Sequence, residues 1–335
     1  MQRVCDRHVR LPWRLGARAG IILVVGALSW YAPSMLVPAD ANAAQRTLRI
    51  SGMRSAPSDG ASFVSAPSRD GRFVAFQSLA TNLASGGSLS SNVYVRDSRG
   101  ASIRRVSKGI AGAAADGFSG APSMDASGRF IAYATAASNV VERDGNDSYD
   151  VVMWDGFTNT QRCVSVTPAG FPASGDSFAP AVSSSGRFVA FVSRATDIAG
   201  GDSGGIADIF LRDMDSGTTI RLSRSSDGGD ANGDSGAPSI SADGRRVAFS
   251  SSASNLVPGD TNGQPDVFLY DASTSTLSRV NVTAGGGVPR VGAIGPCISG
   301  DGRRVAFESI SDQLVKGDRN GVRDIFVRDI AGRYT

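Results

Sequence analysis

The chain has 335 residues, 41 of them glycine, and 19% of its side chains are charged. Its formal net charge of +3 comes from the first 43 residues, which hold five arginines and two aspartates; without them the charges balance. A body with no net charge has no overall attraction to nucleic acid, so no nucleic-acid partner is expected. The single histidine, His8, lies in that first segment, which excludes imidazole acid–base chemistry and His-ligated metals from the rest.

Residues 1–43 have the pattern of a secretory signal peptide. An arginine-bearing start precedes the apolar stretch 19–37, and residues 41–43 (Ala-Asn-Ala) fit the small-x-small cleavage pattern. A retained membrane anchor is the alternative, but Pro33 and Pro38 interrupt the stretch, and no later segment is long and apolar enough to span a bilayer. We therefore expect a periplasmic or secreted protein with no membrane span after signal cleavage.

A Gly-Arg turn followed by a short apolar run recurs five times along the chain, with its glycines 57, 58, 58 and 58 residues apart. A period this regular indicates one supersecondary unit that is copied and stacked. The turns are Gly71-Arg72, Gly128-Arg129, Gly186-Arg187, Gly244-Arg245 and Gly302-Arg303. One domain, 44–335, would then contain repeats at approximately 52–107, 108–165, 166–223, 224–281 and 282–335.

Each repeat carries signals for four short strands. A Pro-Ser segment comes first, the apolar run after the Gly-Arg turn is second, and a third strand follows a longer loop. The third strands are expected to begin at Asn92, Asp150, Asp208, Asp266 and Asp324. The fourth strands are expected at 103–107, 162–165, 220–223 and 277–280. Four antiparallel strands whose middle pair is apolar on both faces predict a propeller blade packed between two neighbours.

The fifth repeat stops at Thr335, too soon for a full fourth strand. Residues 46–51 (Arg-Thr-Leu-Arg-Ile-Ser) match residues 102–107, the end of the first repeat. We therefore predict an all-β fold: a five-bladed β-propeller of four-stranded blades, closed by the N-terminal strand 46–51 completing the last blade. Closure of this kind removes exposed sheet edges. A six-bladed ring would need a further copy of the repeat.

The phrase Pro-Ser-x-Ser-x-Asp-Gly-Arg-x-Val-Ala-Phe and the strand Asp-Val-Phe-x-x-Asp resemble the TolB-type propeller repeat, a WD-repeat-like family common among exported bacterial proteins. The resemblance covers nearly all of 46–335 and implies a propeller in an exported protein. The repeats here are long, and no extra N-terminal domain like that of the family's namesake is recognised. That protein's role in an envelope complex is therefore not implied, because propellers carry many unrelated activities.

The loops between second and third strands and between repeats should open on one face, which is rich in Asp, Asn and Gly and is the predicted binding surface. The motif Asp-x-Asn-Gly-x-x-Asp recurs there, and its oxygens could suit calcium. The alternative is an Asx turn that orders the loop, because the motif lacks the later glutamate of a full calcium loop. The candidate calcium ligands are Asp144, Asn146, Asp150, Asp260, Asn262, Asp266, Asp318, Asn320 and Asp324. No other cofactor is expected.

Other conspicuous residues receive structural interpretations. The phrase 201–205 (Gly-Asp-Ser-Gly-Gly) copies a serine-protease nucleophile motif, but no histidine base remains to activate the serine, so we interpret it as a degenerate loop copy. The five turn arginines are expected to bind neighbouring carboxylates or carbonyls. Cys163 and Cys297 fall in distant repeats, so we expect small buried thiols and no disulfide.

These features predict an exported, non-catalytic propeller scaffold that binds a protein, peptide or envelope polysaccharide through its Asp/Asn/Gly-rich loop face. The polar residues recur from repeat to repeat, whereas an enzyme usually breaks its own symmetry at one place. The alternative is a carboxylate-based hydrolase or lyase acting on extracellular polymer, with aspartates from different blades converging at the central channel. Candidates for that role are Asp116, Asp176 and Asp234.

Overall fold

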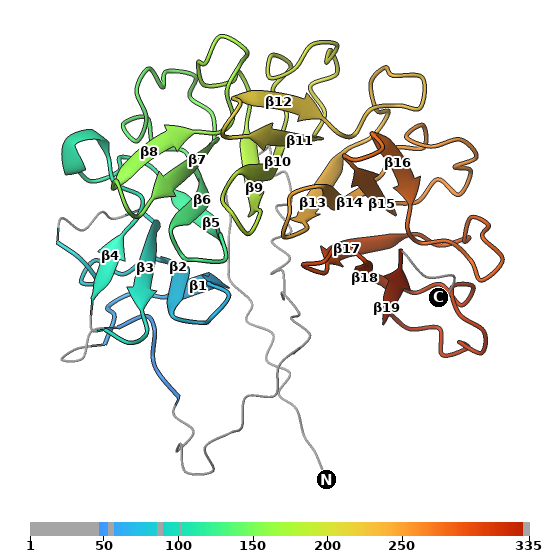
Figure 1. Cartoon of the computed structure of the whole chain (residues 1–335), viewed down its shortest axis with the longest axis horizontal. Helices are drawn as coiled ribbons and strands as arrows, with labels where there is room; N and C mark the ends of the chain where they lie inside the picture. Colours follow the sequence, from blue (N-terminus) through green and yellow to red (C-terminus); the bar gives the residue numbers. More distant parts are fainter. Residues whose placement is uncertain (1–46, 53–56, 86–89, 101, 331–335) are drawn as a thin grey trace, which may run out of the picture.

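The computed structural model describes residues 47–52, 57–85, 90–100 and 102–330 of the chain. Its strands form five antiparallel sheets that follow one another in an arc, in sequence order (Figure 1). Four sheets have four strands, and the last sheet has three. The prediction of an all-β fold with five blades is confirmed.

The strands of each blade are adjacent in the sequence. Blade one contains β1 (Ser62–Pro67), β2 (Phe73–Ser78), β3 (Asn92–Asp97) and β4 (Ile103–Arg105). Blade two contains β5 (Ser119–Met124), β6 (Phe130–Thr135), β7 (Asp150–Asp155) and β8 (Thr160–Cys163), after a short 3₁₀ turn, η1 (Ile110–Gly112). Blade three contains β9 (Ser177–Val182), β10 (Phe188–Ser193), β11 (Asp208–Asp213) and β12 (Thr218–Arg221). Blade four contains β13 (Ser235–Ile240), β14 (Arg246–Ser251), β15 (Asp266–Asp271) and β16 (Thr276–Arg279). Blade five contains β17 (Ala293–Ile298), β18 (Arg304–Ser309) and β19 (Asp324–Asp329).

The third strands begin at the five predicted residues, but the fourth strands of blades one, two and three end two residues earlier than expected, and that of blade four ends one residue earlier. The reason is a side chain that replaces a backbone bond of the ladder. The backbone N–H of Val151 donates to Ser165 Oγ at 3.0 Å, and that of Ile209 donates to Ser223 Oγ at 2.8 Å. The chain can therefore leave the sheet while the third strand stays hydrogen-bonded.

Neighbouring blades pack through apolar side chains on both faces of the middle strands. Ile209 and Leu211 of blade three share one core cluster with Val247 and Phe249 of blade four. Three of these four side chains have no exposed surface, and Leu211 is 4% exposed. Burying such a side chain stabilises the fold by about 1.5–3 kcal/mol relative to leaving it in water. The interfaces between blades are thus the core of the molecule.

The predicted closure of the ring is not seen. Residues 47–52 lie against blade one, where Arg96 of β3 donates hydrogen bonds to the carbonyls of Ile50 and Gly52. Ile50 also packs against the apolar cluster of that blade, so this segment finds both polar and apolar partners there. Residue 46, the first of the predicted strand, lies outside the described residues.

The two end blades stand apart on either side of the opening in the arc (Figure 1). Ile325 and Val327 of β19 are 68% and 53% exposed, whereas their counterparts two blades earlier, Ile209 and Leu211, are buried. Among the described residues, no neighbouring blade covers this face of the last blade as one does in the blades before it. Within the residues that the structure describes, no helix has the length and apolarity needed to cross a bilayer.

Candidate functional site

The long loops gather on one face because the strands are antiparallel. In blade two they are 136–149, between β6 and β7, and 164–176, which leads to blade three. The loop that leads into blade two is hydrogen-bonded to the long loop within that blade: Asn139 Nδ2 donates to the carbonyl of Ala114 at 2.9 Å, and Asp116 N–H donates to Asn139 Oδ1 at 3.2 Å. Many of the polar groups on this face therefore hold the loops together.

The three aspartates proposed for catalysis are used in the same way. Ser138 Oγ donates to Asp116 at 2.7 Å, and the backbone N–H of Tyr149 donates to Asp176 at 3.0 Å. Asp234 accepts the N–H of Ala207 at 2.8 Å and forms an ion pair with Arg194 at 3.0 Å. They belong to three successive blade junctions. In the described parts of the chain, no three His, Cys, Asp or Glu side chains lie close enough together to hold a metal ion.

The serine-protease phrase is a structural loop, as expected. Ser203 Oγ donates to Asp230 at 2.6 Å, and Asp202 forms an ion pair with Arg221 at 3.2 Å. These contacts join the loop to the end of β12 and to the loop between blades three and four. Neither Cys163 nor Cys297 is part of a disulfide, but both are half-buried where buried thiols were expected.

The turn arginines bind carboxylates in the first three blades, where Arg72, Arg129 and Arg187 pair with the aspartate that ends the third strand, at 2.9, 2.7 and 2.6 Å. The hydrogen bonds from Arg129 lower the pKa of Asp155 to about 2. In blades four and five the next residue takes this role: Arg246 lies 2.8 Å from Asp271, and Arg304 lies 3.9 Å from Asp329. The pairing expected of Arg245 and Arg303 is therefore made by the residue after each of them. At that position an arginine replaces the phenylalanine of the first three repeats.

The Asp-x-Asn-Gly-x-x-Asp motif forms an Asx turn in each of its three copies. The side-chain oxygens of Asn146, Asn262 and Asn320 accept the backbone N–H two residues later, at 2.9–3.0 Å. The amide nitrogen of the same asparagines donates to the aspartate four residues later, at distances of 2.7–3.3 Å. The asparagine thus turns a donor, not an oxygen, toward that carboxylate. Calcium binding at these loops stays a prediction.

A buried guanidinium lies between the two aspartates of the motif in blade four. Arg279, which ends β16, lies 2.9 Å from Asp260 and 3.3 Å from Asp266, and the three side chains are 6%, 1% and 0% exposed. In blade three, Arg221 makes the equivalent contacts to Asp202 and Asp208, and a third to Asp230 at 2.8 Å. A buried carboxylate needs such a partner, because desolvation strongly disfavours the charge.

Blade two lacks this guanidinium. Counting back 58 residues from Arg221 leads to Cys163. Asp144 and Asp150 are still present, and Asp150 is fully buried. Its carboxylate accepts hydrogen bonds from Ser165 Oγ at 2.7 Å and from Asn146, and the Cys163 sulfur lies 3.8 Å away. Sequence reasoning missed this exception, although the 58-residue step that aligned the third strands also aligns Arg105, Cys163, Arg221 and Arg279.

Neighbouring charges act in opposite directions at the two equivalent aspartates. Burial raises the pKa of Asp150 to about 6, and the nearby Asp144 carboxylate adds to the rise. Burial also raises the pKa of Asp208 to about 6, but there the charge of Arg221 opposes the rise. Burial raises the pKa of the Cys163 thiol as well, so this sulfur is a neutral thiol and not a nucleophile.

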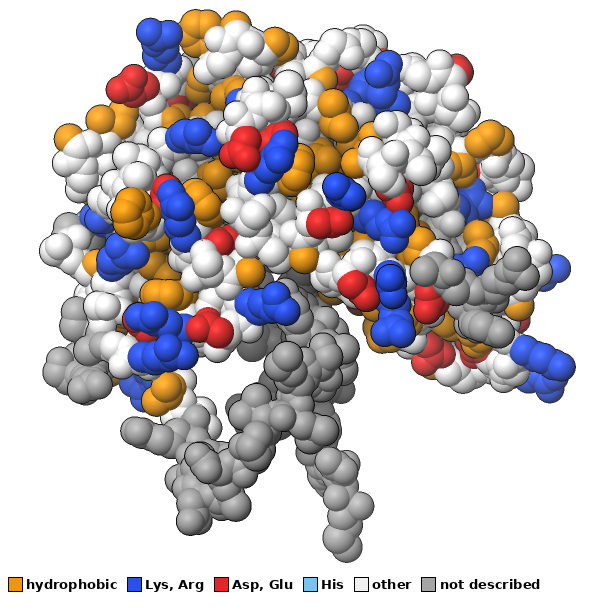
Figure 2. Space-filling model, viewed as in Figure 1, with side chains coloured by type: hydrophobic (Ala, Val, Ile, Leu, Met, Phe, Trp, Pro, Cys, Tyr) orange, Lys and Arg blue, Asp and Glu red, His pale blue; other side chains and the backbone are white. Residues whose placement is uncertain are grey.

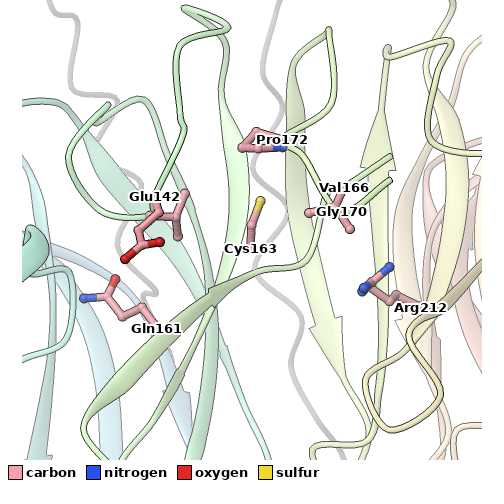
Figure 3. Close-up of a pocket in the computed structure, with 8 residues that line it drawn as sticks. Glu142, Gln161, Cys163, Val166, Gly170, Pro172 and Arg212 are labelled. Carbon is pink, nitrogen blue, oxygen red and sulfur yellow. The ribbon is translucent and has the colours of Figure 1, made fainter. Parts of the chain in front are cut away.

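Two adjoining pockets follow the outer strand of blade two. The first, of about 300 Å³, is lined by Cys163, Glu142, Gln161 and Arg212, and by loop residues 166–172 in part. Figure 3 shows Cys163 between Glu142 and Gln161 on one side and Arg212 on the other. The second, of about 520 Å³, shares Val141, Glu142 and Gln161 with the first and continues over Trp154 to η1. Together they form a groove along β8.

Comparison with known proteins gives structural neighbours only. No protein-family model and no curated protein matches the chain. Among solved structures, TolB of Acinetobacter baumannii has 16% identity and a TM-score of 0.45 over 82% of this chain, which spans 53% of that structure. The chain is similar to TolB propellers.

Other similar structures belong to enzymes of different kinds. The β-propeller domain of the Trilobed protease of Pyrococcus furiosus has 10% identity and a TM-score of 0.49, covering 81% of this chain and 69% of that one. An oligogalacturonate lyase of Vibrio parahaemolyticus has 10% identity and a TM-score of 0.45, covering 83% and 68%. Likeness at this level concerns the fold, so function must be argued from this chain's own residues.

Proposed function

We propose that this chain is an exported, non-catalytic propeller scaffold that binds a protein, peptide or envelope polysaccharide along its long-loop side. The observation that carries this proposal is the use of the polar loop residues within the fold. Asp116, Asp176 and Asp234 each hold a neighbouring loop in place, which favours a structural role over acid–base chemistry for these carboxylates. Export rests on the signal-like segment 1–43, and cleavage would place the protein in the periplasm or outside the cell.

The groove along β8 supports a binding role. It joins two pockets of about 300 and 520 Å³, a size range typical of ligand sites. Ile110, which lines the larger pocket, is 49% exposed, and Phe171, between two residues that line the smaller one, is 46% exposed. Exposed apolar side chains beside fixed polar groups are typical of surfaces that bind a partner.

The charge pattern of the surface is compatible with a partner that carries both acidic and basic groups. Acidic and basic side chains lie next to one another in small groups over the face in view (Figure 2). The coloured part of this face shows no extended region of one sign, which a polyanion such as nucleic acid would require (Figure 2).

Selection from a random peptide library and binding to a glycan array, both with the full chain, test this function. We expect ligands that bind the native protein and lose at least tenfold in affinity when Ile110→Asp places a charge in the groove. Ile220→Asp is the matched control, because Ile220 is 44% exposed on β12, outside the groove. If no ligand is obtained, or if both variants bind equally well, the proposal is wrong; depolymerisation of an array polysaccharide would favour the hydrolase or lyase.

A further inference from the structure

The smaller pocket of blade two borders the position that corresponds to a guanidinium in blade three. Two of its lining residues are Cys163 and Pro172. Their counterparts 58 residues later are Arg221 and Asp230, which are joined by an ion pair of 2.8 Å. Replacing the arginine by cysteine and the aspartate by proline removes both partners of that pair. The pocket is thus bordered by the positions of both missing partners.

The carboxylates that bind the guanidinium in blade three are nevertheless retained in blade two. Asp144 and Asp150 correspond to Asp202 and Asp208, and the Asx turn through Asn146 still holds the loop in place. Blade two even adds an acid, because Glu142, at the mouth of the pocket, stands where blade three has Gly200. Glu142 lines the pocket, and the buried Asp150 carboxylate lies 3.8 Å from the sulfur of Cys163, which also lines it. The counterparts of Cys163 in blades three and four are arginines that pair with the corresponding aspartates.

The far wall of the pocket offers a hydrogen-bond donor. Arg212 of β11 lines it, and its Nη1 donates to Thr219 at 2.9 Å. Its Nε is buried and has no hydrogen-bond partner among the described residues. A buried N–H without a partner is costly, so a ligand that brings an acceptor oxygen would be stabilised here. Arg212 also carries a positive charge, which would repel a second cationic group of the ligand on this side of the pocket.

We propose that this pocket binds an arginine side chain of a peptide or protein partner, whose guanidinium takes the place that Arg221 fills in blade three. The guanidinium would lie against Asp144 and Asp150, with Glu142 at the entrance. A carbonyl oxygen of the same peptide would accept the hydrogen bond from Arg212 Nε. Arginine fits better than lysine because its planar group can contact two carboxylates at once, as Arg221 and Arg279 do.

This inference rests on the proposed scaffold function and specifies its ligand. In blades three and four the fourth strand supplies the cation. In blade two the cation would come from a bound partner. The recognition is selective because a neutral side chain of the same length would leave the buried carboxylates without a counter-charge.

The test uses an acetylated and amidated pentapeptide, Gly-Ala-Arg-Ala-Gly, and the same peptide with citrulline in place of arginine. Isothermal titration of the full chain at pH 8 should show at least tenfold tighter binding of the arginine peptide, because hydrogen bonds between charged partners are the strong ones. Cys163→Arg should abolish this binding, since it returns to the pocket the residue that blades three and four carry. Equal binding of both peptides, or undiminished binding to Cys163→Arg, would overturn the proposal.

Further variants separate this result from simpler explanations. Asp150→Asn, which copies Asn92 of blade one, should also lose at least tenfold in affinity, and it serves if Cys163→Arg does not fold. Asp312→Asn, an exposed change in blade five, should bind as the native chain does. If calcium, and not the arginine peptide, raises the melting temperature of the native chain but not of Cys163→Arg, the pocket binds a metal and the proposal is wrong.

The outcome also distinguishes this inference from the general function. Library ligands that bind the native chain and Cys163→Arg equally would leave the scaffold function intact and overturn only the arginine pocket. Failure to obtain any ligand, together with activity on a polysaccharide, would overturn the scaffold function itself.

Discussion

Replacing Arg279 by cysteine, the residue that blade two carries at this position, is expected to lower the free energy of unfolding by about 3–5 kcal/mol. Asp260 and Asp266 are almost completely buried, and Arg279 is the cation that lies between them. Removing it leaves two desolvated negative charges without a counter-charge. Urea unfolding of the full chain at pH 8 measures the loss.

The control is Arg72→Ala, which breaks an ion pair of similar length, 2.9 Å, whose arginine is 41% exposed. Solvent screens such a pair, so this loss should be much smaller than that of Arg279→Cys. Burial raises the pKa of Asp266 above its ordinary value, so a folded state without Arg279 takes up a proton as the pH falls. The deficit of Arg279→Cys should therefore shrink toward pH 5. Equal losses for the two variants would contradict the role assigned to the buried guanidinium.

Replacing Gly186 by alanine should cost about 2–5 kcal/mol, because this glycine of the Gly-Arg turn meets two separate constraints. Its φ of +76° disfavours any residue with a Cβ, at a cost of about 1–2 kcal/mol. A Cβ atom there would also stand 2.2 Å from the ring of Phe130 in the preceding blade. The neighbouring ring must then move within a close-packed interface, which costs about 1–3 kcal/mol more.

Gly71→Ala separates the two terms. Gly71 occupies the same turn of blade one with a φ of +68°, but a Cβ there would meet no atom within 4 Å. We expect it to lose only the conformational part, about 1–2 kcal/mol. Thermal unfolding of both variants beside the native chain provides the comparison. Equal losses would show that the approach of Phe130 does not matter for stability.

The fold could be predicted to the extent that it is local and repeated. The strand starts at Asp150, Asp208 and Asp266 follow from a 58-residue period, since each copy must place the same pleat in the same environment. The ends of the fourth strands were wrong by two residues in blades one, two and three, because the hydroxyls of Ser107, Ser165 and Ser223 replace a ladder bond there. Strand propensity gives no signal that a side-chain hydrogen bond will replace a backbone one.

Ring closure depends on contacts far apart in the chain, and here prediction from the repeat failed. A matching phrase at 46–51 indicates a strand type, but Ile50 finds apolar and hydrogen-bonding partners on blade one instead. In the candidate site, the Asx-turn alternative describes the observed bonds of Asn262, whereas Cys163 was interpreted only as a small thiol. Cys163 matters because it stands where the neighbouring blades have an arginine. The role of that arginine is known only from the ion pairs that Arg221 and Arg279 form with their aspartates.

The stability of Cys163→Arg tests most directly the idea that blade two retains carboxylates arranged for a cation it does not itself supply. Its free energy of unfolding at pH 8 should exceed that of the native chain by at least about 1 kcal/mol, because a guanidinium would add charged hydrogen bonds to carboxylates that have only neutral partners in the native chain. A decrease of similar size would show that the pocket of blade two is closed to a guanidinium, and would contradict both the site and its proposed ligand.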